Sequence, residues 1–281
     1  MKIANYELFE IETGSFALDG GSMFGIVPKT FWEKTNPPDE KNRIELAARC
    51  LLAIGNGKII LIDSGNGEKY NSKRQEIFKF NNSQFSLERS LNKLNISADD
   101  ITDLILTHLH FDHCGGNTKI ENGNIIPTFK NAIYHVQRNH WDWANDLQVR
   151  DAKSFLKENF EIINSNSQLN FIDGEKEIFP NINLIISNGH TTSLQLPLIS
   201  DAKSSLLFCA DLMPTISHLP LTYGMAFDLR PLEIVEEKKK IFTRAAKEKW
   251  ILFSEHDPIV KSISIKEVEN NFAIDEINNF E

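Results

Sequence analysis

The sequence predicts a layered α/β protein in which short apolar strands end in loops that carry histidine and aspartate. Three observations predict this class. Short runs of β-branched and apolar residues recur along the chain, and segments with helical spacing separate several of them. The candidate chemical groups follow the ends of predicted strands. Because loops at strand ends converge over a rigid sheet in such folds, we expect these groups to build one site.

The composition is that of a globular protein with a sizeable core. The chain has 281 residues, of which 41% are hydrophobic and 25% are charged, and we expect a single domain over residues 1–281. The net charge of −9 disfavours binding to a phosphate backbone, so we expect no nucleic-acid partner. We expect the partner to be a small-molecule substrate of the site described below.

The sequence indicates a cytoplasmic protein that does not enter a membrane. No stretch approaches the roughly 18 apolar residues of a membrane span, and the first residues lack the apolar run of a signal peptide. The three cysteines, Cys50, Cys114 and Cys209, have no C-x-x-C spacing. That pattern is typical of reduced thiols in a cytosolic protein.

The chain begins with a strand, predicted over residues 6–13. Residues 14–27 contain a glycine pair and predict a hairpin or a loop. Residues 23–32, which overlap the end of this range, are unusually apolar for a loop and include Met23, Phe24 and Trp32. Two interpretations stay open: these side chains pack in the core, or they form the wall of a substrate pocket. An exposed apolar stretch here also leaves a homodimer open.

A second hairpin follows. Residues 47–54 and 58–62 predict two buried strands, joined by the turn Gly55-Asn56-Gly57. The second strand ends at Asp63. This aspartate is either the cap of a turn, which is its commoner role, or a carboxylate that holds a metal-bound histidine from behind.

A dense group of metal-binding residue types follows the next predicted strand, residues 103–107. His108, His110, Asp112 and His113 form the pattern H-x-H-x-D-H. On an extended segment the first two histidines leave on the same side, and the last two residues follow where the chain turns at a glycine pair. This arrangement indicates two adjacent divalent metals.

The segments on either side of the motif contain predicted helices and a predicted strand, and we expect no ligand among them. Helices are predicted over residues 86–94, with Ser86 as cap, over 138–145 and over 151–159, and a strand is predicted over 131–136. His135 and His140 lie here outside the ligand spacing, so we expect them to be structural or surface residues.

Three more strands of the second half also end in ligand types. The strands over residues 184–187, 205–209 and 250–253 are followed by His190, Asp211 and His256 respectively. Each is individually either a ligand or an ordinary loop residue, and together with the motif they favour a site. Between them, residues 231–249 predict a helix with proline first, glutamates early and lysines late. We expect its lysine run, residues 238–240, to be a solvated face.

This set of residues resembles the metallo-β-lactamase superfamily, in which H-x-H-x-D-H is followed by a histidine in a Gly-His-Thr context, an aspartate after a strand, and a late histidine. The resemblance implies a four-layer αββα sandwich with a dinuclear metal site at one edge of the sheets. It also implies a ligand assignment. His108, His110 and His190 would hold one metal, Asp112, His113 and His256 would hold the other, and Asp211 would bridge them.

Three stretches resemble one branch of this superfamily, which contains quorum-quenching N-acyl homoserine lactonases and methyl parathion hydrolase. The stretches are residues 21–29, 112–117 and 210–215. This sequence departs from the branch at Ser193, where the family has glycine, and at Pro214, where many lactonases carry tyrosine. The group that assists the substrate carbonyl is therefore open, and His218 and Tyr223 are the candidates.

The ligand types indicate the metal and the reaction. Imidazole and carboxylate ligands without thiolate favour two Zn²⁺ ions, with Mn²⁺, Co²⁺ or Fe²⁺ as alternatives. Such a pair generates a hydroxide that attacks a carbonyl carbon or a phosphorus, and Asp112 or the metal itself would pass a proton to the leaving group. The first hypothesis is a lactonase or related esterase; phosphotriester hydrolysis and thioester hydrolysis are the alternatives.

Other classes fit the sequence less well. A flavodiiron-like oxidoreductase usually needs an attached flavin domain, a nuclease finds no support in the acidic charge, and a metal-binding module without turnover is the remaining alternative. For the lactonase hypothesis, the segment from Met213 to Asp228 supplies a second apolar stretch, with Phe227 near its end. It forms either a substrate wall or packing under a sheet edge.

Overall fold

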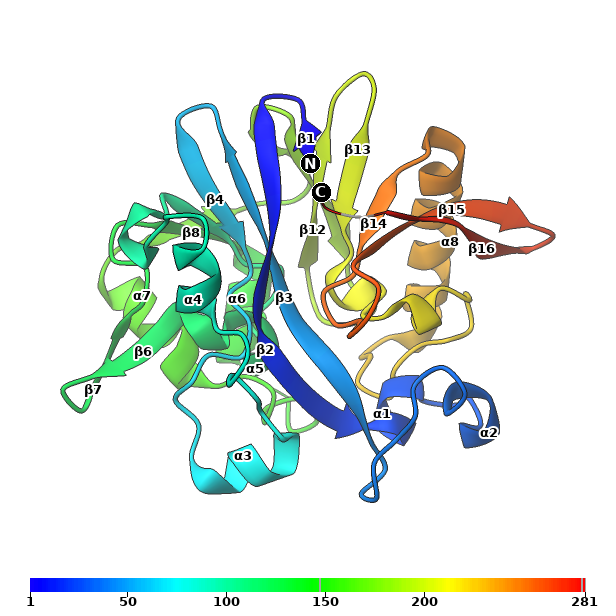
Figure 1. Cartoon of the computed structure of the whole chain (residues 1–281), viewed down its shortest axis with the longest axis horizontal. Coiled ribbons are helices and arrows are strands. Elements are labelled where there is room, and N and C mark those ends of the chain that lie inside the picture. The colour runs from blue at the N-terminus through cyan, green and yellow to red at the C-terminus, as the bar shows by residue number, and fades with distance from the viewer. Residues whose placement is uncertain (147, 279, 281) are drawn as a thin grey trace. The chain divides into compact units, whose positions relative to one another are not determined.

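The computed structural model describes residues 1–146, 148–278 and 280. Within them the chain divides into two compact units (Figure 1). The first unit comprises residues 1–15 and 48–174, and the second comprises residues 16–47 and 175–281. Two long strands, β2 (Tyr6–Asp19) and β3 (Arg43–Gly55), run from one unit into the other. The prediction of a single domain stays a prediction.

The first sheet is mixed. Its strands, in spatial order, are β1 (Lys2–Ile3), β2, β3, β4 (Lys58–Ile62), β5 (Asp103–Ile105), β8 (Ile133–Gln137) and β9 (Leu169–Ile172). β3 and β4 pair antiparallel, whereas β4, β5, β8 and β9 are successively parallel. The parallel strands therefore end at the same edge, and the H-x-H-x-D-H motif follows β5 at that edge.

The hairpin predicted over residues 47–62 is confirmed. β3 and β4 pair in register from Leu51 opposite Ile62 to Gly55 opposite Lys58. The two turn residues, Asn56 and Gly57, have φ values of 51° and 73°. Two central residues with positive φ are the requirement of a type I′ turn, and Asn-Gly satisfies it at low cost.

Short helices and a small hairpin complete the first unit. They are α3 (Ser72–Phe78), α4 (Leu87–Asn92), α5 (Phe111–Cys114), α6 (Arg138–Asn145), α7 (Glu161–Ser165), η1 (Ala98–Asp100), η2 (Gly115–Asn117) and η3 (Lys157–Asn159), with strands β6 (Thr118–Glu121) and β7 (Asn124–Pro127). α4 begins after Ser86, whose hydroxyl accepts from the amide of Arg89, as predicted for a cap. The helix predicted over residues 151–159 is wrong: only η3 forms there.

The core of the first unit surrounds the motif. Leu104, Leu106 and Leu109 are buried with Cys114 and Phe129 in one apolar cluster. Leu104 and Leu106 alternate along the strand, and Leu109 enters the same core from between the two histidines. These apolar anchors fix the direction of the polar residues beside them.

The second sheet is also mixed and lies within the second unit. Its strands are β10 (Glu177–Phe179), β11 (Ile182–Ser187), β12 (Leu194–Ser200), β13 (Ser205–Phe208), β14 (Ile251–Phe253), β15 (Ser262–Val268) and β16 (Asn271–Asn278). Only β13 and β14 among these described strands pair parallel. Both are short and buried, as expected for strands covered on both faces.

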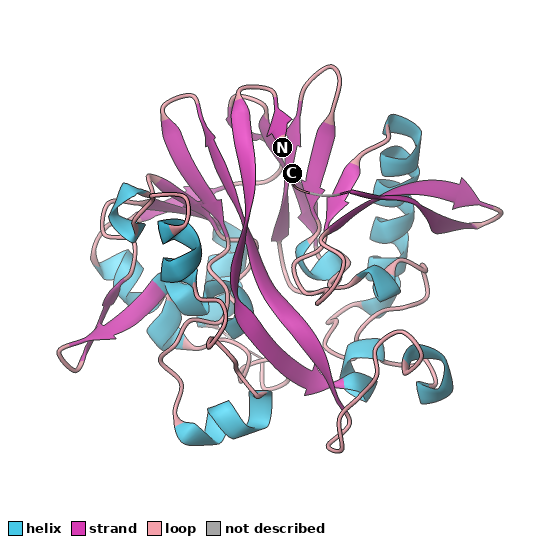
Figure 2. Cartoon of the chain, viewed as in Figure 1, coloured by secondary structure: helices cyan, strands magenta, loops and turns pink. Residues whose placement is uncertain are grey.

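The helices of the second unit are α1 (Gly20–Phe24), α2 (Lys29–Trp32), α8 (Pro231–Glu248), η4 (Ala210–Leu212) and η5 (Ile216–His218). Figure 2 shows α8 as a long helix beside the strands of the second sheet, and it packs on β15. α8 has proline at its start, as predicted. The two mixed sheets with flanking helices that the sequence predicts are thus present.

Candidate metal centre

The motif leaves β5 as an extended segment and then turns into α5. Two contacts fix its path: the amide of Leu106 donates to the carbonyl of His135 (3.1 Å), and the amide of Leu109 donates to Nε2 of His140 (2.8 Å). His135 also pairs with Asp103 (Nε2–Oδ1, 2.9 Å). Both histidines are buried in structural contacts, which is one of the two alternatives that the sequence left open.

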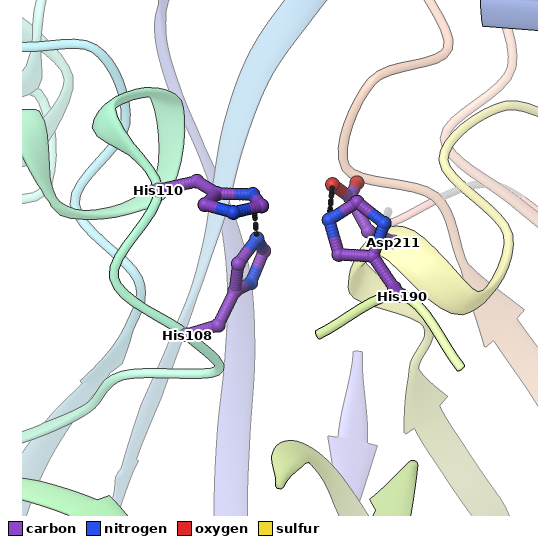
Figure 3. Close-up of side chains that lie close together, drawn as sticks. All are labelled: His108, His110, His190 and Asp211. Atoms are coloured by element: carbon purple, nitrogen blue, oxygen red, sulfur yellow. Dashed lines mark hydrogen bonds and ion pairs between the residues drawn. The ribbon is translucent and has the colours of Figure 1, made fainter. Parts of the chain in front are cut away.

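Three buried imidazoles gather in the first unit. Nε2 of His108 lies 3.0 Å from Nδ1 of His110, the pair joined by a dashed line in Figure 3. The ring centroids of His108 and His113 are 4.0 Å apart. Asp112 is also buried, with one carboxylate oxygen 3.9 Å from Nε2 of His113. We refer to these four residues as the first cluster.

Asp63 supports the first cluster from the end of β4. Oδ1 accepts from the amide of Thr107 (2.7 Å), and Oδ2 lies 2.6 Å from the Thr107 hydroxyl and 3.1 Å from Nδ1 of His113. The two readings of Asp63 from the sequence are therefore compatible. Its carboxylate orders the chain before the motif and fixes the ring of His113, which directs Nε2 away from Asp63.

A glycine pair closes the motif because the chain passes over the β4 loop at close range. A Cβ on Gly115 would lie 1.9 Å from the carbonyl oxygen of Asn66, and one on Gly116 would lie 2.2 Å from that of Ser64. Real Cβ atoms do not tolerate such distances, so glycine is required here by close approach.

The second unit holds a separate group of buried ligand types. Nε2 of His190 lies 3.0 Å from Oδ2 of Asp211, and a dashed line joins these two residues in Figure 3. Nε2 of His256 lies 3.4 Å from Oδ1 of the same carboxylate. His190 follows β11, Asp211 lies in η4 after β13, and His256 follows β14. We refer to these three residues as the second cluster.

Oxygen atoms behind the two histidines set their tautomers. Nδ1 of His256 lies 2.9 Å from the carbonyl of Ala47, and Nδ1 of His190 lies 2.9 Å from Oδ1 of Asp228. A carbonyl or carboxylate oxygen accepts, so each Nδ1 carries the proton. Each Nε2 is thereby turned toward Asp211, and a neutral imidazole held in this way offers its Nε2 lone pair to a metal on that side.

Two carboxylates dominate the electrostatics of His190. Burial lowers the pKa of this imidazole, but the carboxylates of Asp211 and Asp228 raise it more, to about 9. The same two carboxylates would favour a divalent cation at this position.

The donor set of both clusters fits divalent metal ions. Imidazole nitrogens and carboxylate oxygens are collected in buried positions, without thiolates, and this suits zinc and similar ions. Buried His/Asp clusters of this kind suggest a metal site. The assignment of individual ligands stays a prediction.

Asp228 is a residue that the sequence analysis did not single out for this role. It ends the apolar segment 213–228, and its Oδ2 also accepts from the amide of Met225 (2.8 Å). The signal in the sequence was its carboxylate at the end of the 213–228 segment, which begins two residues after the candidate ligand Asp211.

The predicted substrate-binding residues are mostly buried. Met23, Phe24, Trp32 and Met213 are all inside the second unit, and Phe24 stacks on Trp32 with ring centroids 5.4 Å apart. Phe227 is 38% exposed. The core-packing interpretation thus describes the buried four in this structure, and a contact with substrate stays a prediction.

His218 and Tyr223 differ in how their polar atoms are used. Nε2 of His218 donates to the carbonyl of Met23 (2.8 Å), and Nδ1 lies 2.8 Å from the hydroxyl of Thr215. Burial, with the nearby ammonium of Lys238, lowers the pKa of His218 to about 3. Tyr223 is half-buried and meets Phe24 edge to face. Both ring nitrogens of His218 are thus engaged with the chain, and Tyr223 stays the other candidate donor.

An exposed apolar cavity lies beside these rings. Ile26 is 92% exposed and Phe31 is 58% exposed. They line a cavity of about 260 Å³ together with Val27, Pro28, Thr222 and Tyr223. The apolar surface predicted for the 23–32 stretch is therefore supplied by Ile26 and Phe31.

The class of protein follows from comparison with known families. A profile of the metallo-beta-lactamase superfamily matches residues 44–256. The chain belongs to this superfamily and has its fold, with two mixed sheets flanked by helices.

Among individual proteins, the chain is similar to an N-acyl homoserine lactonase from Bacillus cereus, with 31% identity over 170 residues. The match covers 59% of this chain, and it spans 60% of that relative's length. Two solved structures share the fold over 99% of this chain. A probable metal-dependent hydrolase from Staphylococcus aureus has a TM-score of 0.90, 25% identity and 98% coverage of its own chain. A dizinc quorum-quenching lactonase has a TM-score of 0.79, 24% identity and 97% coverage.

Over residues 1–146, 148–278 and 280, no helix has the length and apolar character needed to cross a bilayer.

Proposed function

We propose that this protein is a dinuclear metal-dependent hydrolase that opens a lactone, of the acyl homoserine lactone type, or a related ester. The observation that carries the proposal is the pair of buried clusters, each at strand ends of its own sheet, in a chain of the metallo-β-lactamase superfamily. The similarity to N-acyl homoserine lactonases supports the substrate class.

The proposed ligand assignment combines both clusters. His108, His110 and His190 would hold one ion, and Asp112, His113 and His256 would hold the other. Asp211 would serve both ions. The contacts of Asp211 with both histidines of the second cluster support this bridging role, because the two carboxylate oxygens already face different imidazoles.

When bound, divalent metals would provide a nucleophilic hydroxide near neutral pH and would polarise the carbonyl of the ester. Residues of the chain would position the ligands, transfer the proton and donate a hydrogen bond. Asp63, Ala47 and Asp228 fix the rings of three histidines from behind. Asp112 accepts a proton and returns it to the leaving alcohol, and the phenol of Tyr223 donates a hydrogen bond to the oxygen that gains negative charge.

The native ions are proposed to be Zn²⁺, and Mn²⁺, Co²⁺ and Fe²⁺ suit the same donors. Metal analysis of the purified protein, followed by a panel of lactones, phosphotriesters and thioesters, tests the proposal. We expect about two ions per chain and turnover of lactones above the other two classes. Preferential turnover of a phosphotriester or a thioester would contradict the substrate class, and one ion or none would contradict the dinuclear centre.

A further inference from the structure

Lys238 is 1% exposed, although it belongs to the lysine run that the sequence predicted to be a solvated helix face. That prediction is wrong for Lys238 and correct for Lys239 and Lys240, which are exposed. A buried ammonium has a high desolvation cost unless oxygen atoms surround it. The buried ammonium group of Lys238 therefore needs oxygen atoms that accept its hydrogen bonds.

The partners of Lys238 are two backbone carbonyls in the segment 213–228. Nζ donates to the carbonyl of His218 (2.7 Å) and to that of Tyr223 (2.7 Å). One side chain thus ties two points of the loop that are five residues apart. The loop between them carries Leu219 and Leu221 and ends at the tyrosine that the proposed reaction uses.

The preceding residue of α8 holds a different loop. The carboxylate of Glu237 accepts from the amide of Asn188 (2.6 Å), the amide of Gly189 (3.2 Å) and the hydroxyl of Ser187 (2.6 Å). These three donors directly precede His190. Gly189 is required here because a Cβ would lie 2.6 Å from the backbone nitrogen of Ile234 on the same helix.

Adjacent residues on a helix point about 100° apart, so one turn of α8 reaches both loops. Asp228 connects the loops a second time, because one of its oxygens contacts His190 and the other accepts from Met225. The loop of the candidate ligand and the loop of the candidate substrate wall are therefore both built on α8, through separate side chains.

We infer that Glu237 and Lys238 are positioning residues with separate tasks: Glu237 sets the loop of His190 and so metal retention, and Lys238 sets the 213–228 segment and so substrate selection. The part that concerns substrate rests on the proposed function. The charge of each residue fits its task, since an anion accepts from backbone amides and a cation donates to backbone carbonyls.

The test compares Lys238→Met with Glu237→Gln, and Lys239→Met is the matched control on the exposed face of the same helix. Methionine retains the length of lysine and suits a buried position, so we expect Lys238→Met to fold. We expect it to keep about two metals per chain and to raise KM about tenfold, with kcat within about threefold, since two hydrogen bonds that order the loop are lost.

Two further readouts do not depend on turnover. In Lys238→Met, hydrogen exchange of the amides between residues 216 and 226 should become faster, and in Lys239→Met it should match the parent. In Glu237→Gln, affinity for Zn²⁺ should fall about tenfold or more, as for other groups that orient a ligand, while exchange in 216–226 stays near that of the parent.

The inference is overturned if Lys238→Met and Lys239→Met give the same KM and the same exchange. It is also overturned if Lys238→Met loses metal as Glu237→Gln does, because the two tasks would then not be separate. If the parent turns over no compound of the panel, the proposed function fails. Hydrogen exchange of the 216–226 amides and the affinity for Zn²⁺ still decide whether Glu237 and Lys238 hold separate loops.

Discussion

Asp63 shows how one residue joins a strand end to a candidate ligand. Its φ is 57°, and it contacts both Thr107 and His113. We expect Asp63→Asn to lower Zn²⁺ affinity about 10- to 100-fold, because a neutral amide orients His113 less firmly and makes it a weaker base. Asparagine tolerates positive φ, so the backbone should be kept.

Titration with a competing zinc chelator measures this affinity. Asp99→Asn, at an exposed position, is the control for a change in net charge. Equal affinity of parent and Asp63→Asn would show that Asp63 only orders the turn.

Asp103 carries a pH prediction that does not involve the metals. Burial raises the pKa of its carboxyl, but the contacts with His135, Lys58 and Thr102 lower it more, to about 2. A carboxyl with a folded pKa below its unfolded value near 4 stabilises the protein above pH 4, and this stability is lost as the pH falls through 2.

We therefore expect metal-free Asp103→Asn to lower the free energy of unfolding by about 2 kcal/mol at pH 6. The difference from the parent should shrink steadily from pH 4 to pH 2. Urea unfolding of both proteins across this range, in the presence of a chelator, measures it. A difference that is constant with pH would mean that the loss comes from packing and not from charge.

Single residues also show what the sequence could and could not predict. The motif residues were found because His108, His110, Asp112 and His113 lie within six positions, where spacing alone implies proximity. Lys238 and Asp228 act on partners 15 to 38 positions away. Contacts at such separations depend on how elements pack, and the local pattern of three consecutive lysines indicated only a charged helix face.

At the scale of elements, the turn from α5 into η2 depends on close packing against the β4 loop. We expect Gly115→Ala to destabilise the protein by more than 2 kcal/mol and to lower metal affinity, because the added Cβ displaces the segment that carries His113. Gly115 has an ordinary helical φ of −60°, so the cost comes from the contact with Asn66.

Gly57→Ala is the control, since its φ of 73° is unfavourable for alanine but nothing lies within 4 Å of a Cβ there. It should cost only about 1 kcal/mol and leave metal binding unchanged. Thermal unfolding with and without Zn²⁺ compares the two. Equal losses of stability in the two variants would mean that the turn shifts enough to accommodate the added methyl group.

Elements with strong local signals were predicted well, as the β3–β4 hairpin and α8 show. The helix predicted over residues 151–159 does not form because this segment pairs with the motif instead. Phe155 forms an isolated bridge with His110, and the carbonyl of Ser154 accepts from the amide of Phe111. These tertiary contacts with the motif replace the local hydrogen bonds of a helix, and helical propensity alone gave no sign of them.

The 213–228 segment carries the prediction about substrate. We expect Tyr223→Phe to lower kcat about 100-fold on a lactone, because an oxyanion loses a donor, with little change in KM. Phe227→Ala should raise KM more for long acyl chains than for short ones, since its exposed ring would contact the tail. His218→Ala should act mainly on stability, because both ring nitrogens already contact the chain.

Steady-state kinetics on lactones of increasing chain length separates these effects. If Tyr223→Phe and Phe227→Ala both match the parent on every substrate, this segment is not the substrate wall. If His218→Ala alone lowers kcat in a folded protein, His218 and not Tyr223 is the donor.

At the scale of the whole molecule, the proposed assignment makes each metal depend on both clusters. One ion would be held by His108, His110 and His190. Bound metals should then stabilise the folded chain. A ligand present at 1,000 times its Kd adds about 4 kcal/mol to the free energy of unfolding, so removal of the metals should lower Tm by several degrees in one cooperative transition.

The last prediction distinguishes a shared centre from two independent ones. In a shared centre, His110→Ala and His190→Ala remove ligands of the same ion. Each variant alone should then reduce the metal content from about two to about one, and the double variant should still retain about one. If each cluster instead held its own ion, the two substitutions would act on different ions, and the double variant would retain none. Elemental analysis after dialysis against a weak chelator counts the ions, and His110→Ala combined with His113→Ala is the control, since the proposed assignment predicts the loss of both. Additive loss in the first pair would contradict the proposed assignment, because two substitutions at one ion cannot release a second one.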